Sequence, residues 1–215
     1  MWQGGESRRG TRVIRTRLGA TSDGTPIEYG GVEIEGPTIT GVGTFREIAT
    51  RNTREIFDLG EQALLPGLIN AHCHLDYTIL RGKISPQSSF ADWIRQINAH
   101  KAVLSEENYL ASIAEGFAEA KRFGTTSLVN LEAFPQLITK IGHSPIRTWW
   151  CPEMIDVREK VDVEKTFNNV RGGVSSREDP VGGIGLAPHA IYTASSNLYR
   201  ETSDLARREN LRLTT

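Results

Sequence analysis

From Ala63 to the end of the chain, short apolar runs alternate with segments of helical period, and this alternation limits the possible folds most strongly. The segments between the runs predict helices over 90–101, from Ser105 to a stop at Gly124, near 135–141, near 163–170 and over 195–209. Buried strands separated by helices form either an open doubly wound sheet or part of a (β/α)8 barrel. The five predicted strands are 63–70, 126–131, 146–151, 181–187 and 211–215.

The first 62 residues follow a different pattern, which indicates β structure. Turn signals at 22–24 and at Gly30 and Gly31 separate short alternating runs at 32–35 and 38–42, which predict strands of a small sheet. We therefore expect an N-terminal β portion over 1–62 and an α/β portion over 63–215. Within the second portion, Gly172 and Gly173 predict a local turn.

Charge and cysteine content exclude several classes of function. The 25 basic and 26 acidic side chains give a net charge of -1, which provides no basic surface for nucleic acid or an anionic membrane and suits a small neutral substrate. Two cysteines are too few for a disulfide framework, and the first residues contain no apolar stretch typical of a signal peptide. We expect a soluble, cytoplasmic protein. The absence of a glycine-rich phosphate motif after any predicted strand argues against dinucleotide binding.

Two histidines directly follow the first apolar run. His72 and His74 are two residues apart, so in an extended segment both side chains point to the same side. Neutral imidazoles suit zinc, iron, copper or nickel. Such a pair alone is more often incidental, but a position at the end of a strand favours a metal site, with Asp76 close enough to orient an imidazole. For Cys73, between the histidines, a buried thiol that faces the other way is favoured over a ligand.

Other polar residues follow the later runs. Glu132 and Glu153 come after the second and third runs and would open onto the same face, although for both we favour solvated loop carboxylates over pocket residues. His189 ends a glycine-rich run on that face, which favours a functional role. The Trp149–Trp150 pair predicts core packing. His100 and His143 are interpreted as surface residues.

Two motifs carry a resemblance to a known family. The run LPGLINAHCHLD at 65–76 resembles the first-strand signature of the metal-dependent amidohydrolase superfamily, in its branch of cytosine deaminases, adenosine-type deaminases and chlorohydrolases. The run GLAPHAIYT at 185–193 resembles the segment after the fourth barrel strand of that branch. The β-rich head also fits, because these enzymes begin with strands of a small β-sandwich.

The resemblance implies a fold and a set of site residues. The fold is a partial TIM-type (β/α)8 barrel of about five strands, preceded by part of a β-sandwich. His72 and His74 would bind one divalent metal, zinc ahead of iron, and His189 would contact the substrate. Asp92, directly before Trp93, resembles an acidic residue that holds a polar group of the substrate; a carboxylate favoured by a helix N-terminus is an equal alternative. A single ion is implied because 182–189 contains no lysine to bridge two.

The implied reaction is hydrolysis of a carbon–nitrogen bond, the deamination of a cyclic amidine such as a nucleobase or nucleoside-like ring. An amide hydrolase or chlorohydrolase of the same superfamily is the alternative. The family's remaining ligands and its acid–base glutamate would follow Thr215, so no catalytic acid or base is assigned here. Because a full barrel takes about 250 residues, we expect the N-terminal portion of an amidohydrolase, inactive by itself, or else a non-catalytic fragment. Its open sheet edges would need a partner fragment or a second copy.

Overall fold

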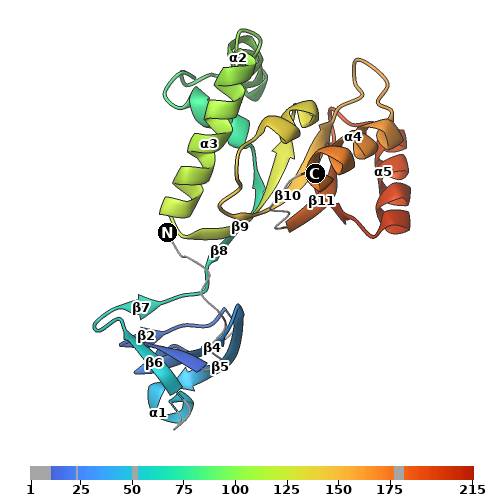
Figure 1. Cartoon of the computed structure of the whole chain (residues 1–215). Coiled ribbons are helices and arrows are strands. Elements are labelled where there is room, and N and C mark those ends of the chain that lie inside the picture. The colour runs from blue at the N-terminus through green and yellow to red at the C-terminus, as the bar shows by residue number, and fades with distance from the viewer. Residues whose placement is uncertain (1–10, 23, 50–52, 177–181) are drawn as a thin grey trace. The chain divides into compact units, whose positions relative to one another are not determined.

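The computed structural model describes residues 11–22, 24–49, 53–176 and 182–215 (Figure 1). The chain divides into two compact units, Met1–Pro66 and Gly67–Thr215. Of the sequence-based expectations, those for residues 1–10, for Asp23 in the first turn and for Val181 at the start of the fourth strand lie outside the described residues. No helix in the described ranges combines the length and the apolar character needed to cross a membrane.

The first unit consists of two small β-sheets and a short helix. A four-stranded sheet has the order β5-β4-β1-β6, and a three-stranded sheet has the order β3-β2-β7. The helix packs against β4, where a Cβ on Gly31 would lie 2.9 Å from the Cα of Phe45. The elements are β1 Thr11–Arg15, β2 Leu18–Gly19, β3 Ile27–Glu28, β4 Gly30–Glu35, β5 Thr38–Thr44, α1 Phe45–Ile48, β6 Thr53–Asp58 and β7 Ala63–Leu64.

The second unit contains a five-stranded parallel sheet with the order β12-β11-β10-β9-β8. Its strands are β8 Leu68–Cys73, β9 Thr125–Glu132, β10 Arg147–Met154, β11 Gly182–Pro188 and β12 Arg212–Leu213. Each strand pairs with the next one along the chain, and the order never reverses as it does in a doubly wound sheet. The sheet curls as the first five strands of a (β/α)8 barrel do, which confirms the predicted partial barrel (Figure 1).

Helices connect these strands and cover one face of the sheet (Figure 1). Ser89, Ser105 and Ser195 begin α2, α3 and α5, and each side chain accepts a hydrogen bond from a backbone N–H of the first turn. Past the end of α3, Gly124 has a φ of 84°, a left-handed conformation that glycine adopts readily. The helices are η1 Leu75–Leu80, α2 Phe90–Lys101, α3 Glu106–Arg122, η2 Pro135–Lys140, α4 Val163–Ser175 and α5 Ser196–Glu209.

Three local expectations differ from the structure. The predicted strand 63–70 is split into β7 and β8 around Pro66, which has no N–H for a strand ladder. The segment 135–141 forms the 3-10 helix η2, with proline in its first turn. The predicted turn at Gly172 and Gly173 is wrong, because α4 runs through both residues. At Gly173, a Cβ would lie 3.3 Å from the side chain of Ile138, so a small residue lets α4 approach η2 closely.

The core of the second unit lies mainly between the sheet and its helices. Of the two tryptophans predicted to pack in the core, Trp150 is buried there beside Phe117 of α3, with ring centroids 6.1 Å apart, whereas Trp149 is half-buried and packs against a third cluster. A second cluster packs α4 and α5 against β11 through residues such as Phe167, Leu186 and Leu205. A third cluster of Leu131, Cys151 and Ala187 occupies alternate positions of the same strands and therefore lies on the other face. That face carries the histidines.

Candidate metal centre

Three histidines converge at the carboxyl ends of β8 and β11. His72 is the fifth residue of β8, His74 follows that strand and His189 follows β11. One ligand atom from each lies within 4.8 Å of the others. The ring centroids are 5.3 Å apart for His72 and His74, 6.0 Å for His72 and His189, and 5.0 Å for His74 and His189. The parallel, curled sheet brings residues distant in sequence to one edge.

Alternation along β8 separates the two histidines from Cys73. The Cys73 thiol points away from them and donates a hydrogen bond to the carbonyl of Val129, with a distance of 3.4 Å from Sγ to O. Burial raises the pKa of this thiol to about 12, so it stays protonated at neutral pH. Cys73 is half-buried, and its side chain faces away from the histidines as predicted; that it is not a ligand stays a prediction.

His74 provides a nitrogen that fits a metal ion. Its Nδ1 atom is buried and has no hydrogen-bond partner among the described residues. Burial lowers the pKa of His74 to about 4, with the nearby Glu153 opposing and His189 adding to the decrease, so the ring is neutral at pH 7. A buried nitrogen without a partner is unfavourable, and a divalent ion would satisfy it. Three imidazoles within reach of one point suit zinc or iron.

His189 is held by a buried carboxylate. Its Nδ1 atom forms an ion pair with Oε1 of Glu153 in β10, a side chain only 10% exposed. Burial alone would raise the pKa of Glu153, but the hydrogen bond and charge of His189, together with Lys101, hold it below its ordinary value. A carboxylate on Nδ1 leaves Nε2 to contact a metal ion or a substrate. The interpretation of Glu153 as a solvated loop residue is wrong, because β10 continues to Met154.

Glu132 is the second carboxylate whose burial the sequence did not reveal. It ends β9, is 1% exposed and accepts hydrogen bonds from Nδ2 of Asn130 and from the N–H of Phe134, both at 3.0 Å. Burial raises its pKa to about 7. Asn130 also accepts the N–H of Leu75 at 3.0 Å and so ties β9 to the residue after His74. The sequence does contain a signal for this burial, because Asn130 and Glu132 are two polar residues on one face of a buried strand.

Two of the predicted substrate contacts, Asp92 and Trp93, lie on α2, at the start of the helix. Asp92 accepts hydrogen bonds from the hydroxyl of Ser89 at 2.7 Å and forms an ion pair with Arg95, which is the arrangement expected of a carboxylate in a first helical turn. Trp93 is 40% exposed and its ring centroid lies 5.7 Å from that of Phe90. Phe90 in turn lies 5.8 Å from Tyr192, three residues after His189. Phe90, Trp93 and Tyr192 form an exposed aromatic cluster, of which the sequence indicated Trp93 alone.

Asp76 has a different partner from the one expected. Instead of contacting an imidazole, its buried carboxylate lies 3.0 Å from Nζ of Lys101, at the end of α2. The ring of Tyr77, the next residue, stacks on His74 with centroids 4.6 Å apart and an interplanar angle of 19°. Aromatic stacking is therefore the contact that orients the His74 ring from this turn.

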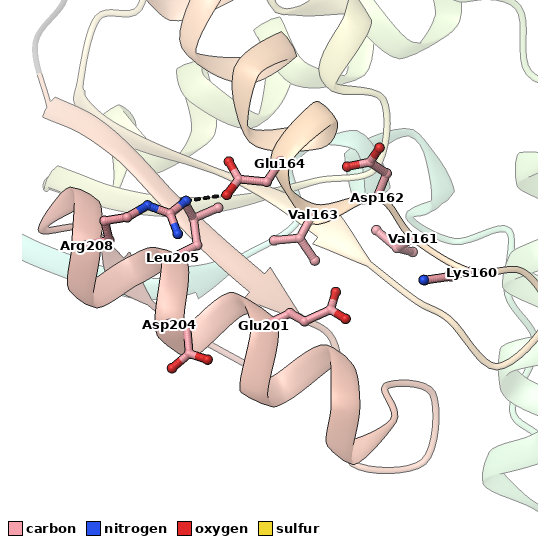
Figure 2. A pocket seen from close by; sticks show the side chains of 9 residues that line it. All are labelled: Lys160, Val161, Asp162, Val163, Glu164, Glu201, Asp204, Leu205 and Arg208. Atoms are coloured by element: carbon pink, nitrogen blue, oxygen red, sulfur yellow. Dashed lines mark hydrogen bonds and ion pairs between the residues drawn. The ribbon is translucent and has the colours of Figure 1, made fainter.

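A separate pocket of about 500 Å³ lies between the start of α4 and α5 (Figure 2). Its acidic groups have local partners: Asp162 accepts the N–H of Lys165, and Glu164 forms an ion pair with Arg208. Its lining residues include none of the three histidines, so it is not part of the candidate centre. They are Lys160, Val161, Asp162, Val163, Glu164, Glu201, Asp204, Leu205 and Arg208.

Comparison with known proteins agrees with the fold. The sequence profile of the Amidohydrolase family matches residues 63–215, well over half of the chain. This chain belongs to the amidohydrolase family. Among curated relatives, the chain is 32% identical over 187 residues to a 5'-deoxyadenosine deaminase of Methanocaldococcus jannaschii, with 83% of this chain and 43% of that protein aligned. It is 29% identical over 198 residues to a 5-methylthioadenosine/S-adenosylhomocysteine deaminase of Syntrophobacter fumaroxidans, with 89% of this chain and 45% of that protein aligned.

Solved structures of this amidohydrolase fold also resemble the chain. A zinc-bound adenosine deaminase from Xanthomonas campestris matches with a TM-score of 0.77 at 22% identity, over 94% of this chain and 48% of that one. An aminofutalosine deaminase from Helicobacter pylori in complex with methylthio-coformycin matches with a TM-score of 0.77 at 18% identity, over 94% of this chain and 50% of that one. The chain thus spans about half the length of these proteins, and the amidohydrolase barrel assignment is confirmed.

Proposed function

We propose that this chain provides the metal-binding part of an enzyme that deaminates a nucleoside-like cyclic amidine and releases ammonia. The observation that carries the proposal is the convergence of His72, His74 and His189 within 4.8 Å at the carboxyl edge of the half-barrel. The relatives named as deaminases of deoxyadenosine and methylthioadenosine support this substrate class. Because the chain covers less than half of their length, the proposal concerns a protein that contains this chain and a complete site.

In this proposal the histidines have two roles. His72 and His74 hold one divalent ion, zinc ahead of iron, and His189 contacts the substrate. When bound, the ion lowers the pKa of a water molecule enough to make hydroxide available at neutral pH. Glu153 keeps the proton on Nδ1 of His189, so that Nε2 accepts or donates the hydrogen bond to the ring nitrogen or the leaving amine.

The substrate would lie between His189 and the start of α2. The aromatic cluster of Phe90, Trp93 and Tyr192 offers ring faces against which a flat heterocycle packs. Asp92, already held by Ser89, would accept a hydrogen bond from a polar group of the substrate. We place this reaction in the cytoplasm, with a small molecule as the partner and with the sheet edges paired by further chain or by a second copy.

The test measures ammonia release by the product of the complete gene. The substrates are adenosine, 5'-deoxyadenosine, 5'-methylthioadenosine, guanine and a chlorotriazine. We expect ammonia from at least one purine, loss of activity with a strong chelator and recovery when zinc is added. Chloride release from the triazine in place of ammonia would identify the chlorohydrolase alternative. Zinc-loaded protein that releases no ammonia from any of these rings would overturn the proposal.

A paired variant separates the two possible roles of His189. His189→Asn is expected to lower kcat/KM by about 10²- to 10⁴-fold, the usual range for loss of a positioned acid–base group, while the bound zinc per chain stays the same. The matched control is His100→Asn on α2, outside the cluster, which should leave both quantities unchanged. Loss of zinc from His189→Asn would show instead that His189 is a metal ligand.

A further inference from the structure

Lys101, the last residue of α2, is a lysine enclosed next to the metal centre. Its side chain is only 12% exposed, and its Nζ lies 3.0 Å from Oδ2 of Asp76, which is 1% exposed. Two aromatic rings flank the ammonium group, with centroids 4.4 Å away for Tyr77 and 5.8 Å away for Phe134. The lysine is thus held by one carboxylate and two ring faces.

This enclosure sets Lys101 apart from ordinary surface pairs. Lys140 and Glu106, for example, form an ion pair with side chains 54% and 41% exposed, and such pairs contribute little to stability. Burial of a lysine and an aspartate requires desolvation of both charges, which their mutual attraction and additional contacts must offset. Cation–π contacts of a desolvated ammonium group supply part of that compensation. The arrangement fixes the end of α2 on the turn that follows β8.

That turn carries a proposed metal ligand. The Tyr77 ring contacts both Lys101 and His74: its centroid is 4.4 Å from the ammonium nitrogen and 4.6 Å from the centroid of the stacked imidazole. Hydrogen bonds hold the backbone of the turn, and the side chain of Leu75 is buried in the core. Ser112 donates to the carbonyl of Asp76 at 2.9 Å, and Asn130 accepts the N–H of Leu75 at 3.0 Å. The Tyr77 ring itself contacts Lys101 and His74, and so links the lysine to the imidazole.

We propose that Lys101 is a positioning residue for the metal centre. Held by Asp76, it fixes the Tyr77 ring, and that ring fixes the His74 imidazole in the orientation that binds the ion. The inference rests on the proposed metal site and adds a part of it that lies one helix away. It also couples the centre to α2, the helix that carries Asp92 and Trp93.

The test compares Lys101→Met with two other variants in the product of the complete gene. Zinc affinity is measured by competition with a chromogenic chelator, and ligand geometry by the visible absorption spectrum of the Co²⁺ complex. Lys101→Met is expected to weaken zinc binding by about 10- to 100-fold, the range seen when groups behind metal ligands are removed, and to change the Co²⁺ spectrum. Lys101→Arg keeps the charge and the cation–π contacts and should recover most of the affinity. Lys140→Met, the matched control, should match the original protein in both measurements.

A further variant, Tyr77→Leu, keeps the test decisive if Lys101→Met does not fold. Tyr77→Leu leaves the lysine and aspartate in place and removes the stacked ring, so it should change the Co²⁺ spectrum in the same way. The inference is overturned if either folded variant, Lys101→Met or Tyr77→Leu, binds zinc with the original affinity and spectrum while His74→Ala does not. If the original protein itself binds neither metal, the proposed metal site fails, whereas unchanged binding in these variants of a protein that does bind zinc overturns this inference alone.

Discussion

At the scale of single residues, the site depends on a carboxylate that holds a histidine. Glu153 lies close to the proposed chemistry, because it pairs with Nδ1 of His189. The pair fixes which nitrogen carries the proton, a role that requires the negative charge as well as the shape of the side chain.

Replacement of Glu153 by glutamine tests that role. Glu153→Gln keeps the shape and one acceptor oxygen but removes the charge, so we expect kcat/KM for deamination to fall about 10- to 100-fold, as for other groups behind functional histidines. The zinc content should stay unchanged. Ammonia assays with the product of the complete gene measure the effect, and Glu164→Gln on the exposed surface of α4 is the control. Unchanged kinetics in Glu153→Gln would contradict the assigned role.

Glu132 should make stability depend on pH. In the unfolded chain its carboxyl ionises near the ordinary pKa of 4.5, whereas burial raises the pKa in the folded protein to about 7. Between pH 4.5 and about 7, Glu132 is protonated in the folded protein and ionised in the unfolded chain. The free energy of unfolding therefore falls as the pH rises through this range, and this contribution is lost completely above about pH 7. A pKa difference of this size corresponds to about 3 kcal/mol.

The measurement is urea denaturation of metal-free protein between pH 4.5 and 8. Glu132→Gln cannot ionise, so its free energy of unfolding should decline less over this range than that of the original protein, by up to about 3 kcal/mol. Asp92→Asn, at an exposed helix start, serves as the comparison. Parallel pH profiles for the original protein and Glu132→Gln would show that Glu132 does not titrate in this range.

Residue-level prediction succeeded where local geometry decides the outcome. Strand alternation alone predicts that the side chains of His72 and His74 point to one side of the strand and that of Cys73 to the other. The structure has this arrangement. It failed for Glu132 and Glu153, because their burial depends on which neighbouring strands and helices enclose the strand ends. The ring contacts of Tyr77 and the enclosure of Lys101 likewise arise from elements that meet only in the folded unit.

At the scale of elements, the boundaries follow local signals. The start of α3 was predicted from its capping residue Ser105 and its apolar period, and α2 and α5 were predicted over nearly their observed bounds. The errors occurred where packing overrides local preference. Gly172 and Gly173 suggest a turn in isolation, yet α4 continues through them because one face of the helix, which includes Gly173, is buried against the sheet and η2.

Two glycines within helices provide a matched prediction. A Cβ on Gly116 of α3 would lie 2.7 Å from the hydroxyl of Thr78 and 2.9 Å from a methyl group of Leu75, whereas a Cβ on Gly172 of α4 would contact nothing within 4 Å. Alanine at Gly172 should stabilise the protein by about 0.5–1 kcal/mol through helix propensity. Alanine at Gly116 should destabilise it by about 1–3 kcal/mol through overpacking.

Thermal and urea unfolding of the two variants measure this contrast. Gly116→Ala should also weaken zinc binding, because the displaced Leu75 directly follows His74. An equal stabilisation of both variants would mean that the turn after β8 shifts to accommodate the added methyl group without loss of stability, and that its packing does not support the metal ligand.

At the scale of the whole molecule, the five parallel strands form an open sheet. In the described residues, β8 pairs with β9 alone and β12 with β11 alone. Apolar side chains are exposed on these edge strands: Leu68 and Ile69 are 58% and 75% exposed on β8, and Leu213 is 45% exposed on β12. Unpaired edges with apolar side chains favour pairing with further strands. The order of apolar runs and helical segments predicted a sheet of buried strands covered by helices, but it did not distinguish a barrel from an open doubly wound sheet. The two family motifs made that distinction.

Metal binding should be linked to the stability of the second unit. All three clustered histidines lie within Gly67–Thr215, so an ion that binds the folded site and not the unfolded chain stabilises that unit. At a free zinc concentration of 100 times Kd, the gain is about 2.7 kcal/mol. Hydrogen exchange read by mass spectrometry should show zinc-dependent protection in peptides from β8 and β11 and none in peptides from β1, β4 and β5.

Two variants complete this test of metal linkage. His72→Ala removes a proposed ligand and should abolish the zinc-dependent protection, while His100→Ala on α2 should retain it. Because His72 is exposed, its replacement removes little packing, so a lost response to zinc reports on ligation and not on a damaged core. Equal zinc protection in His72→Ala and the original chain would place the ion elsewhere and would contradict the histidine centre.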